Sequence, residues 1–276
     1  MKNIDTYKRY LLLRNLSKKT IKSYTANIVT VSNRIGIEPS EITEHDLVSY
    51  LVSENERNLS TSSQMLLINS FKSFFKIIHK RELDSDILPR PKVEQKQPDI
   101  LSEEEVQILI NATVNVKHKT IFILMYSGAL RVSEVINMKI SDIDSRNNKI
   151  NIRCAKGRID RFIPLSDKLL LALKNYWKIY KTSKYLFEGI TGGKYSVGSI
   201  QTAVKSNIKK TSINKSISTH SFRHSSITHM IKNGANIRVV QKIAGHKNIN
   251  TTANYVKIYD TDVMDVESPL LNIEIE

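Results

Sequence analysis

His220-Ser-Phe-Arg-His224, near the C-terminal end of the chain, opens the stretch that organises the second half of the sequence. We expect a helix over residues 221–232 and two further helices over 236–244 and 249–257. Gly245 directly follows the second of these, where helices commonly end with a glycine in the left-handed conformation. The spacing therefore predicts three short helices joined by tight turns.

Upstream of these helices the sequence predicts a mixed α/β arrangement. Ile150-Asn-Ile-Arg153 and Arg161-Phe-Ile-Pro-Leu165 alternate in polarity and are expected to form two strands of a hairpin. The turn between them carries Lys156-Gly157. Ser102-Glu-Glu-Glu105 is a capping box before an apolar run and predicts the start of a helix. The remaining expected helices cover residues 119–127, 166–180 and 196–209.

The N-terminal segment predicts four short helices. The first ends near Asn15, and the second has Ser17 as its N-cap and Gly36 as its terminating glycine. The third begins at the capping-box-like Thr43-Glu-His-Asp46. The fourth is expected from about Thr61 to Lys80, with apolar side chains at helical spacing on one face.

A proline-containing segment separates the two halves. Pro89, Pro91 and Pro98 fall there among charged and amide side chains without an apolar period, which is typical of an extended linker. The expected fold is mainly α-helical with a small antiparallel β-sheet: an N-terminal helical bundle followed by a mixed α/β domain. The expected organisation is a helical domain over 1–84, a linker over 85–98, a second domain over 99–257 and an acidic tail over 258–276.

The composition describes a globular protein and excludes several classes. The chain has 276 residues, 40% of them hydrophobic and 25% charged, which suits two folded domains. Its one cysteine, Cys154, excludes an intrachain disulfide framework and a cysteine-rich zinc site. The apolar stretch Ile121–Tyr126 is too short to span a membrane, and the first residues lack an apolar signal segment. We therefore expect a cytoplasmic protein.

The net charge of +15 is unevenly distributed along the chain. Residues 98–257 carry a net charge of +16, whereas residues 258–276 carry −6. Such a local surplus favours binding to a polyanion, because each phosphate neutralised by lysine or arginine releases condensed counterions. A lysine-rich composition bias without any partner is the alternative interpretation of charge alone.

Side chains able to cleave a phosphodiester without a metal occur in order along the C-terminal half. A tyrosine hydroxyl has an unperturbed pKa of about 10, so it needs nearby cations or a base to act as a nucleophile. Arginines match the oxygens of phosphate, histidines transfer protons or donate hydrogen bonds, and a lysine can protonate the leaving oxygen. The candidates are Arg131, Lys156, His220, Arg223, His246 and Tyr255, with Glu134 beside the first of them.

Each candidate alone also has an ordinary structural explanation. Arg131 could cap a helix or pair with Glu134 three residues later, and Lys156 could be a solvated turn residue. A single tyrosine among eleven is more often a packing or surface residue than a nucleophile. The order and spacing of the whole set, and not any one member, carry the prediction.

Four separated boxes resemble, in the same order, the sequence pattern of the tyrosine recombinases, the phage-integrase family. Ser127-Gly-Ala-Leu-Arg-Val-Ser-Glu134 matches the first box, and residues 155–165, 220–224 and 244–255 match the others. More loosely, residues 16–24 resemble the start of the family's core-binding domain. The departures, none of them at a reacting side chain, are Ala155, Ile163, Phe222 and Ala244.

The resemblance implies a role for each candidate. Tyr255 would be the nucleophile that forms a 3′-phosphotyrosine and frees a 5′ hydroxyl. Lys156 would be the general acid, and His220 would assist proton transfer. The remaining implied roles are phosphate binding by Arg131, Arg223 and His246, and support of the site by Glu134. Neither a cofactor, a metal nor ATP is implied.

The resemblance also implies partners. The expected substrate is a double-stranded DNA recombination site, with a homo-tetramer acting on two duplexes through a Holliday junction. The tail 258–276 is expected to dock in trans on a neighbouring protomer, although its six carboxylates also fit a disordered end. Accessory proteins are possible, and integration, excision, inversion and resolution all remain open as the biological outcome.

Two rival functions and two local ambiguities accompany this interpretation. The rivals are a type IB topoisomerase and a DNA-binding accessory protein with a relict active site. Tyr259 lies four residues after Tyr255 and is an alternative nucleophile. His220 and His224 have a spacing that metal ligands use, but the adjacent glutamate of the His-Glu-x-x-His motif is missing. The histidines assigned to packing or surface are His45, His79, His118, His224 and His229.

Overall fold

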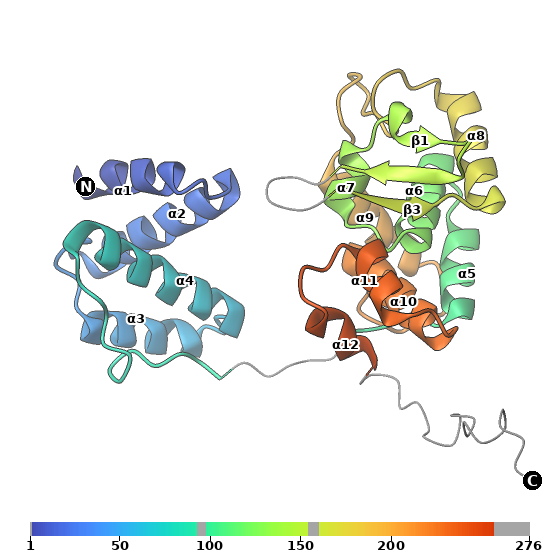
Figure 1. Ribbon diagram of the computed structural model, residues 1–276. Coiled ribbons are helices and arrows are strands. Elements are labelled where there is room, and N and C mark those ends of the chain that lie inside the picture. Colours follow the sequence, from blue (N-terminus) through green and yellow to red (C-terminus); the bar gives the residue numbers. More distant parts are fainter. Residues whose placement is uncertain (1, 93–97, 154–159, 257–276) are drawn as a thin grey trace, which may run out of the picture. The chain divides into compact units, whose positions relative to one another are not determined.

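The computed structural model describes residues 2–92, 98–153 and 160–256 (Figure 1). The chain divides into two compact units, Met1–Lys96 and Gln97–Glu276. Both are built mainly of α-helices, and the second also contains a three-stranded antiparallel sheet. The expected fold class is therefore confirmed. No helix in the described residues is both long and apolar enough to cross a membrane.

The N-terminal unit is a bundle of four α-helices that ends in a π-helical turn. Its core joins Tyr7 and Leu11 of the first helix to Ile28 of the second and to Phe71 and Phe74 of the fourth, all fully buried. The ring of Tyr7 meets Phe74 edge-on at 5.3 Å between centroids. The elements are α1 (Lys2–Leu13), α2 (Lys18–Ile35), α3 (Glu44–Glu56), α4 (Thr61–Phe74) and η1 (Phe75–His79).

Local capping chemistry sets the ends of these helices as the sequence predicted. Ser17 accepts a hydrogen bond from the backbone N–H of Thr20, and Gly36 ends α2 at φ +72°. At the start of α3, Thr43 and Asp46 form a complete capping box. Each such cap satisfies backbone donors or acceptors that a helix end leaves without an intrahelical partner.

The fourth helix differs from the expected single helix over 61–80. Its α-helical part ends at Phe74, and Phe75–His79 continue as a π-helical turn. The wider turn keeps both consecutive phenylalanine rings buried. It also places the His79 ring 5.6 Å from the ring of Phe74 and 5.5 Å from the ring of Phe75. Sequence periodicity cannot show such a change of pitch, because it spans only one turn.

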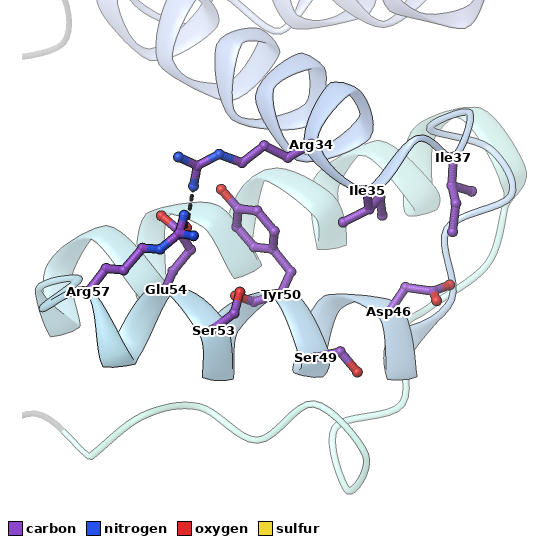
Figure 2. Close-up of a pocket in the computed structure, with 9 residues that line it drawn as sticks. All are labelled: Arg34, Ile35, Ile37, Asp46, Ser49, Tyr50, Ser53, Glu54 and Arg57. Carbon is purple, nitrogen blue, oxygen red and sulfur yellow. Dashed lines mark hydrogen bonds and ion pairs between the residues drawn. The ribbon is translucent and has the colours of Figure 1, made fainter.

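A pocket in the N-terminal unit is lined by the end of α2 and by α3 (Figure 2). Arg34 and Arg57 both pair with the carboxylate of Glu54, so one of the two positive charges at this end of the pocket is compensated. Tyr50 and Ser53 lie beside them. None of the residues that the sequence singled out for chemistry lines this pocket.

In the C-terminal unit α6 (Val116–Ser127) is the central helix. It packs against α5 (Glu103–Ala112), α7 (Val132–Asn137), α8 (Asp167–Tyr180) and α10 (Thr219–Lys232). Its second half, Ile121–Tyr126, is an uninterrupted apolar run, which is typical of a helix segment surrounded by other elements. The predicted helix is confirmed, with Asn115 as its N-cap.

The sheet has the strand order β1-β2-β3, with both neighbouring pairs antiparallel. β2 (Lys149–Ile152) and β3 (Arg161–Pro164) are the predicted hairpin, with Ile150 opposite Ile163. Both isoleucines are buried in the core, whereas Phe162 is exposed. β1 (Ile143–Asp144) was not predicted, because two residues are too few for an alternating pattern to be seen.

The remaining helices surround this core. The predicted helices α8, α9 (Val197–Ile208), α10, α11 (Ile237–Ala244) and α12 (Asn250–Val256) are all present. α7 was not predicted, because its six residues span less than two turns. α10 packs against α6, α9, α11 and α12, and α11 also contacts β3 (Figure 1). The last three helices are therefore joined to the central helix through α10 and to the sheet through α11.

Replacing Thr43 with alanine removes the side-chain oxygen that caps α3, and we expect it to lower the unfolding free energy of the N-terminal unit by about 1 kcal/mol. Thr30→Ala is the matched control, because Thr30 is exposed within α2, where alanine is the better helix former. Urea unfolding followed by circular dichroism measures both. Equal stability of the two variants would show that the cap contributes nothing.

Candidate active site

The candidate residues of the C-terminal boxes come from neighbouring elements of the second unit. His220 and Arg223 lie in the first two turns of α10, and Arg131 is the N-cap residue of α7. His246 follows the end of α11, and Tyr255 lies on α12. α10, α11 and α12 all contact one another, as the orange and red ribbons of Figure 1 show. Residues more than a hundred positions apart in sequence thus share one region.

A small apolar cluster packs these elements together. It joins the loop before α7 to α10, α11 and α12, separately from the main core. Tyr255 is a member and is only 7% exposed, so its ring is held by packing. The buried members are Ala129, Ile227, Val240, Ala244 and Tyr255.

The C-terminal end of α11 collects three arginines from three other elements. Arg223 donates through Nη2 to the carbonyl oxygen of Ala244 at 2.6 Å, and Arg131 donates through Nη1 to the same oxygen at 3.4 Å. Arg161, from β3, donates through Nε to the carbonyl oxygen of Ile243 at 2.6 Å. The last carbonyls of a helix have no intrahelical donor and carry partial negative charge, so they suit guanidinium groups.

Two backbone positions make this convergence possible. Gly245 ends α11 at φ +64°, and a Cβ there would lie 3.0 Å from Nη1 of Arg161. The turn thus needs glycine both for its conformation and for the close approach of the guanidinium. Ala129 has φ +49°, and its carbonyl oxygen accepts from Nη1 of Arg223 at 2.6 Å. A left-handed alanine costs about 1 kcal/mol, which this buried hydrogen bond helps to offset.

Glu134 is the carboxylate that balances part of this charge. It accepts two parallel hydrogen bonds from Arg161, both at 3.0 Å, and one from Nη1 of Arg131 at 3.1 Å. Burial raises its pKa, but the hydrogen bonds and charge of Arg161, followed by those of Arg131, outweigh burial and hold the pKa below its usual value. Glu134 is therefore ionised at neutral pH and fixes both arginines.

Arg161 was missed as a site residue by the sequence analysis, which assigned it only to a strand. Its side chain is 8% exposed and joins β3 to both Glu134 and the end of α11. The signal in the sequence was an arginine at the first position of a short strand that otherwise alternates. A fully charged residue at a position predicted to face the core calls for a buried acidic partner.

The cluster carries more positive than negative charge. Among the described residues, Glu134 pairs with Arg131 and Arg161, whereas Arg223, only 4% exposed, donates to backbone carbonyls. Burial and the neighbouring charge of Arg131 lower the pKa of Arg223 to about 10, well above neutral pH, so the group stays charged. A buried surplus of arginine charge with fixed donor directions is suited to an anion such as phosphate.

Tyr255 lies within the field of these cations. Burial raises the pKa of its hydroxyl, while the charges of Arg223 and Arg131 act in the opposite direction. The net pKa remains above the usual value, so the hydroxyl is protonated at neutral pH. Acting as a nucleophile therefore requires that its proton be accepted by another group.

His224 contacts the Tyr255 hydroxyl directly, although the sequence analysis had assigned it to packing or surface. Its Nδ1 lies 2.6 Å from the hydroxyl oxygen, and the two rings are 5.6 Å apart. His220, four residues earlier on the same face of α10, is exposed, and its ring lies 6.5 Å from that of His224. The i, i+4 spacing was visible in the sequence; that α12 would bring a tyrosine to it was not.

His246 lies on the other side of the tyrosine. Its ring is nearly parallel to that of Tyr255, with 6.4 Å between centroids, and its Nδ1 lies 2.9 Å from the hydroxyl of Thr252. Burial, followed by the charges of Arg223 and the other arginines, lowers the pKa of His246 to about 4. It is therefore neutral at neutral pH and can donate one ring hydrogen bond without bringing further charge.

Two predicted residues lie outside the described part of the chain. Lys156 falls in the 154–159 segment, and the alternative nucleophile Tyr259 falls after residue 256. The strand that follows the lysine turn begins at Arg161, which is bonded to Glu134. Within the described residues, no group of three or more His, Cys, Asp or Glu side chains could hold a metal ion.

Comparison with known proteins identifies the family. Residues 99–262 match the phage integrase family, and residues 4–85 match the phage integrase N-terminal SAM-like domain. The chain belongs to the phage integrase family. The resemblance of the four sequence boxes is thereby confirmed, and the N-terminal helical bundle is the SAM-like domain of phage integrases.

Relatives of known name support the same family. The tyrosine recombinase XerA of Pyrococcus horikoshii is 34% identical over 261 residues, which are 92% of this chain and 88% of XerA. A crystal structure of XerA recombinase is 29% identical, with a TM-score of 0.55 over 94% of this chain and 95% of that chain. A lambda integrase tetramer bound to a Holliday junction is 17% identical and shares the fold, with a TM-score of 0.73 over 90% of this chain and 77% of that chain.

Replacing Arg161 with alanine leaves a buried carboxylate with one of its two arginine partners, and we expect it to destabilise this phage-integrase domain by about 3 kcal/mol. Lys149→Ala is the control on the neighbouring strand. Its ion pair with Asp144 is longer, at 3.9 Å, its side chain is 39% exposed, and its loss should cost less than about 1 kcal/mol. Urea unfolding measures both, and equal losses would contradict a stabilising role for Arg161.

Proposed function

We propose that this chain is a site-specific DNA recombinase that cleaves and rejoins DNA through a 3′-phosphotyrosine at Tyr255. The observation that carries the proposal is the surplus of buried guanidinium charge acting on the hydroxyl of that tyrosine. Membership of the phage integrase family supports the same reaction. Because religation reverses cleavage, the phosphodiester bond energy is conserved and ATP is not required.

The proposed roles follow from the contacts. Arg131 and Arg223 bind the scissile phosphate, because each guanidinium carries five N–H donors and the protein carbonyls engage only some of them. His246 donates a hydrogen bond to a phosphate oxygen, and His220 assists proton transfer. Glu134 keeps the arginine donors in place before DNA arrives, which is the kind of preorganisation that stabilises a charged transition state.

Lys156 is proposed as the general acid that protonates the leaving 5′ oxygen. Its turn leads into β3, whose first residue, Arg161, is bonded to Glu134 and to the end of α11. Lys156 precedes Arg161 by only five residues in the sequence, which supports a place for it near the arginine cluster. Together these residues supply organic cations without any cofactor or metal.

The proposed partners are a double-stranded DNA recombination site and three further copies of the chain. Residues 1–84 would bind one side of the duplex, the 85–98 linker would span it and the 99–257 domain would carry the chemistry. A homo-tetramer on two duplexes is proposed by analogy with the lambda integrase tetramer bound to a Holliday junction. Docking of the tail 258–276 in trans, help from accessory proteins and a cytoplasmic location belong to the same proposal.

The first prediction for this function concerns the nucleophile. Nicked suicide duplexes tiled across the DNA that flanks the gene, incubated in EDTA, should give a covalent protein–DNA adduct with the wild-type chain and with Tyr259→Phe. Tyr255→Phe should give none, because the attacking oxygen is missing. A denaturing gel measures the adduct. An adduct formed by Tyr255→Phe but not by Tyr259→Phe would assign the nucleophile to Tyr259, and tight binding without any adduct would favour a relict DNA-binding protein.

A second prediction concerns Lys156. Lys156→Ala should lower the cleavage rate by about 100-fold or more, since an acid is lost from the leaving oxygen. A substrate with sulfur in place of the bridging 5′ oxygen should restore the rate, because a thiolate leaves without a proton. Single-turnover adduct formation measures the rate on both substrates. An equal defect on both would show that Lys156 does not act on the leaving group.

A further inference from the structure

The proposed reaction needs a group that takes the proton of Tyr255, and three histidines lie near it. His224 is the one whose ring nitrogen touches the hydroxyl, with 2.6 Å between Nδ1 and the oxygen. His220 is exposed, and the described residues show no hydrogen bond from it to Tyr255. The Nδ1 of His246 is engaged with the hydroxyl of Thr252 at 2.9 Å. Of these three histidines, His224 is therefore the one that contacts the Tyr255 hydroxyl.

We propose that His224 is the general base of the reaction, accepting the proton of Tyr255 at Nδ1 during cleavage and returning it during rejoining. This rests on the proposed function. It assigns the direct acceptance of the Tyr255 proton to the histidine that follows Arg223, which the sequence analysis left in the packing class. His220, whose ring lies 6.5 Å from that of His224, then assists the transfer without touching the nucleophile.

The protonation states of His224 and Tyr255 in the free protein allow a proton to move from the tyrosine to the histidine. Burial, then the charges of His220 and Arg223, lower the pKa of His224, so the free protein holds it neutral with one ring nitrogen able to accept. The tyrosine hydroxyl is protonated, because burial raises its pKa. The hydrogen bond is therefore best assigned as Tyr255 donating to Nδ1 of His224.

Binding of the DNA phosphate would raise the pKa of His224 before the Tyr255 proton is transferred. The same arginines that lower the histidine pKa values bind the phosphate in the proposed function, and its negative charge opposes theirs. His246 is the weaker candidate, because burial, followed by the charges of Arg223, Arg131 and Arg161, lowers its pKa to about 4. Neutralisation of the cations by DNA thus raises the basicity of His224 only when a phosphate is in place.

The step balances in both directions. In cleavage the Tyr255 oxygen forms a bond to phosphorus while its proton moves to His224, and the bond from phosphorus to the 5′ oxygen breaks. That oxygen keeps the electron pair and takes a proton from Lys156. In rejoining, the 5′ hydroxyl gives its proton to Lys156 as its oxygen attacks phosphorus, the tyrosine oxygen leaves with the electron pair, and His224 gives its proton back to that oxygen.

The decisive variants are His224→Ala and His224→Asn. An asparagine amide can accept the tyrosine hydrogen bond near the position of Nδ1 but cannot take up the proton. Both variants should cut single-turnover adduct formation by about 100-fold or more while binding the duplex as wild type does. Imidazole in solution should restore part of the activity of His224→Ala. The substrate with a bridging 5′ sulfur should rescue Lys156→Ala but neither His224 variant.

His229→Ala is the matched control. His229 lies five residues further along α10, and its Nδ1 is 2.8 Å from the hydroxyl of Tyr126, so it is a histidine–tyrosine pair of the same kind away from Tyr255. This variant should keep the cleavage rate of wild type. A comparable loss in His229→Ala would trace the His224 defect to damage of the helix.

The remaining outcomes distinguish this inference from the proposed function. If His224→Asn forms the adduct at the wild-type rate, His224 only positions the Tyr255 hydroxyl. If either variant cleaves faster than wild type, the hydrogen bond holds Tyr255 back in the free protein. Loss of duplex binding in both variants would mean a structural role. Each of these overturns the inference while wild type still forms the adduct. Absence of an adduct with wild type on any duplex would overturn the proposed function itself.

Discussion

Three guanidinium groups gathered at the same helix end, two of them buried, are the constraint on which the second domain depends. They repel one another, and each needs acceptors that the interior rarely offers. The end of α11 supplies two carbonyl oxygens, the left-handed Ala129 supplies a third, and Glu134 supplies a full negative charge. Helix ends, a strained loop and the sheet are thus tied to one another through arginine, so that the apolar core alone does not determine their positions.

The same excess of positive charge affects the protonation of the other residues in the site. Burial is the larger cause that lowers the pKa values of His224 and His246, and the positive charges add to it, so both rings stay neutral beside the cations. The positive charge opposes, without overcoming, the effect of burial on Tyr255. In the proposed reaction, such a site holds an inactive nucleophile before DNA binds, because the Tyr255 hydroxyl is protonated. Binding of an anion removes part of the surplus, so substrate and basicity are coupled by electrostatics without any conformational change being invoked.

Sequence reasoning found what local chemistry and family pattern determine. Side-chain caps such as Ser17 and Thr43 and the left-handed Gly245 require only neighbouring residues, so they were predicted correctly. β1 and α7 were missed because they are too short for a periodic signal. The partners of Arg161 and His224 were missed for another reason: Glu134 and the end of α11, and likewise Tyr255, are brought to them by packing between elements distant in sequence. The sequence pattern proposed the candidate residues, whereas the balance of charge among them was visible only in the three-dimensional structure.

Arrangement of the arginines before DNA binds has a further consequence for the chemistry. A metal ion can enter the site together with its substrate. Guanidinium groups belong to the protein, so their mutual repulsion and their loss of water must be compensated already in the free protein. Because carbonyls from α11 and Ala129 already orient Arg223 and Arg131, little reorganisation remains when the phosphate acquires its transition-state charge. Holding these cations close together lowers the stability of the free domain. The paired hydrogen bonds between Glu134 and Arg161 offset part of that cost. Arg161 can therefore influence cleavage through the arrangement of Glu134 and α11 without touching DNA.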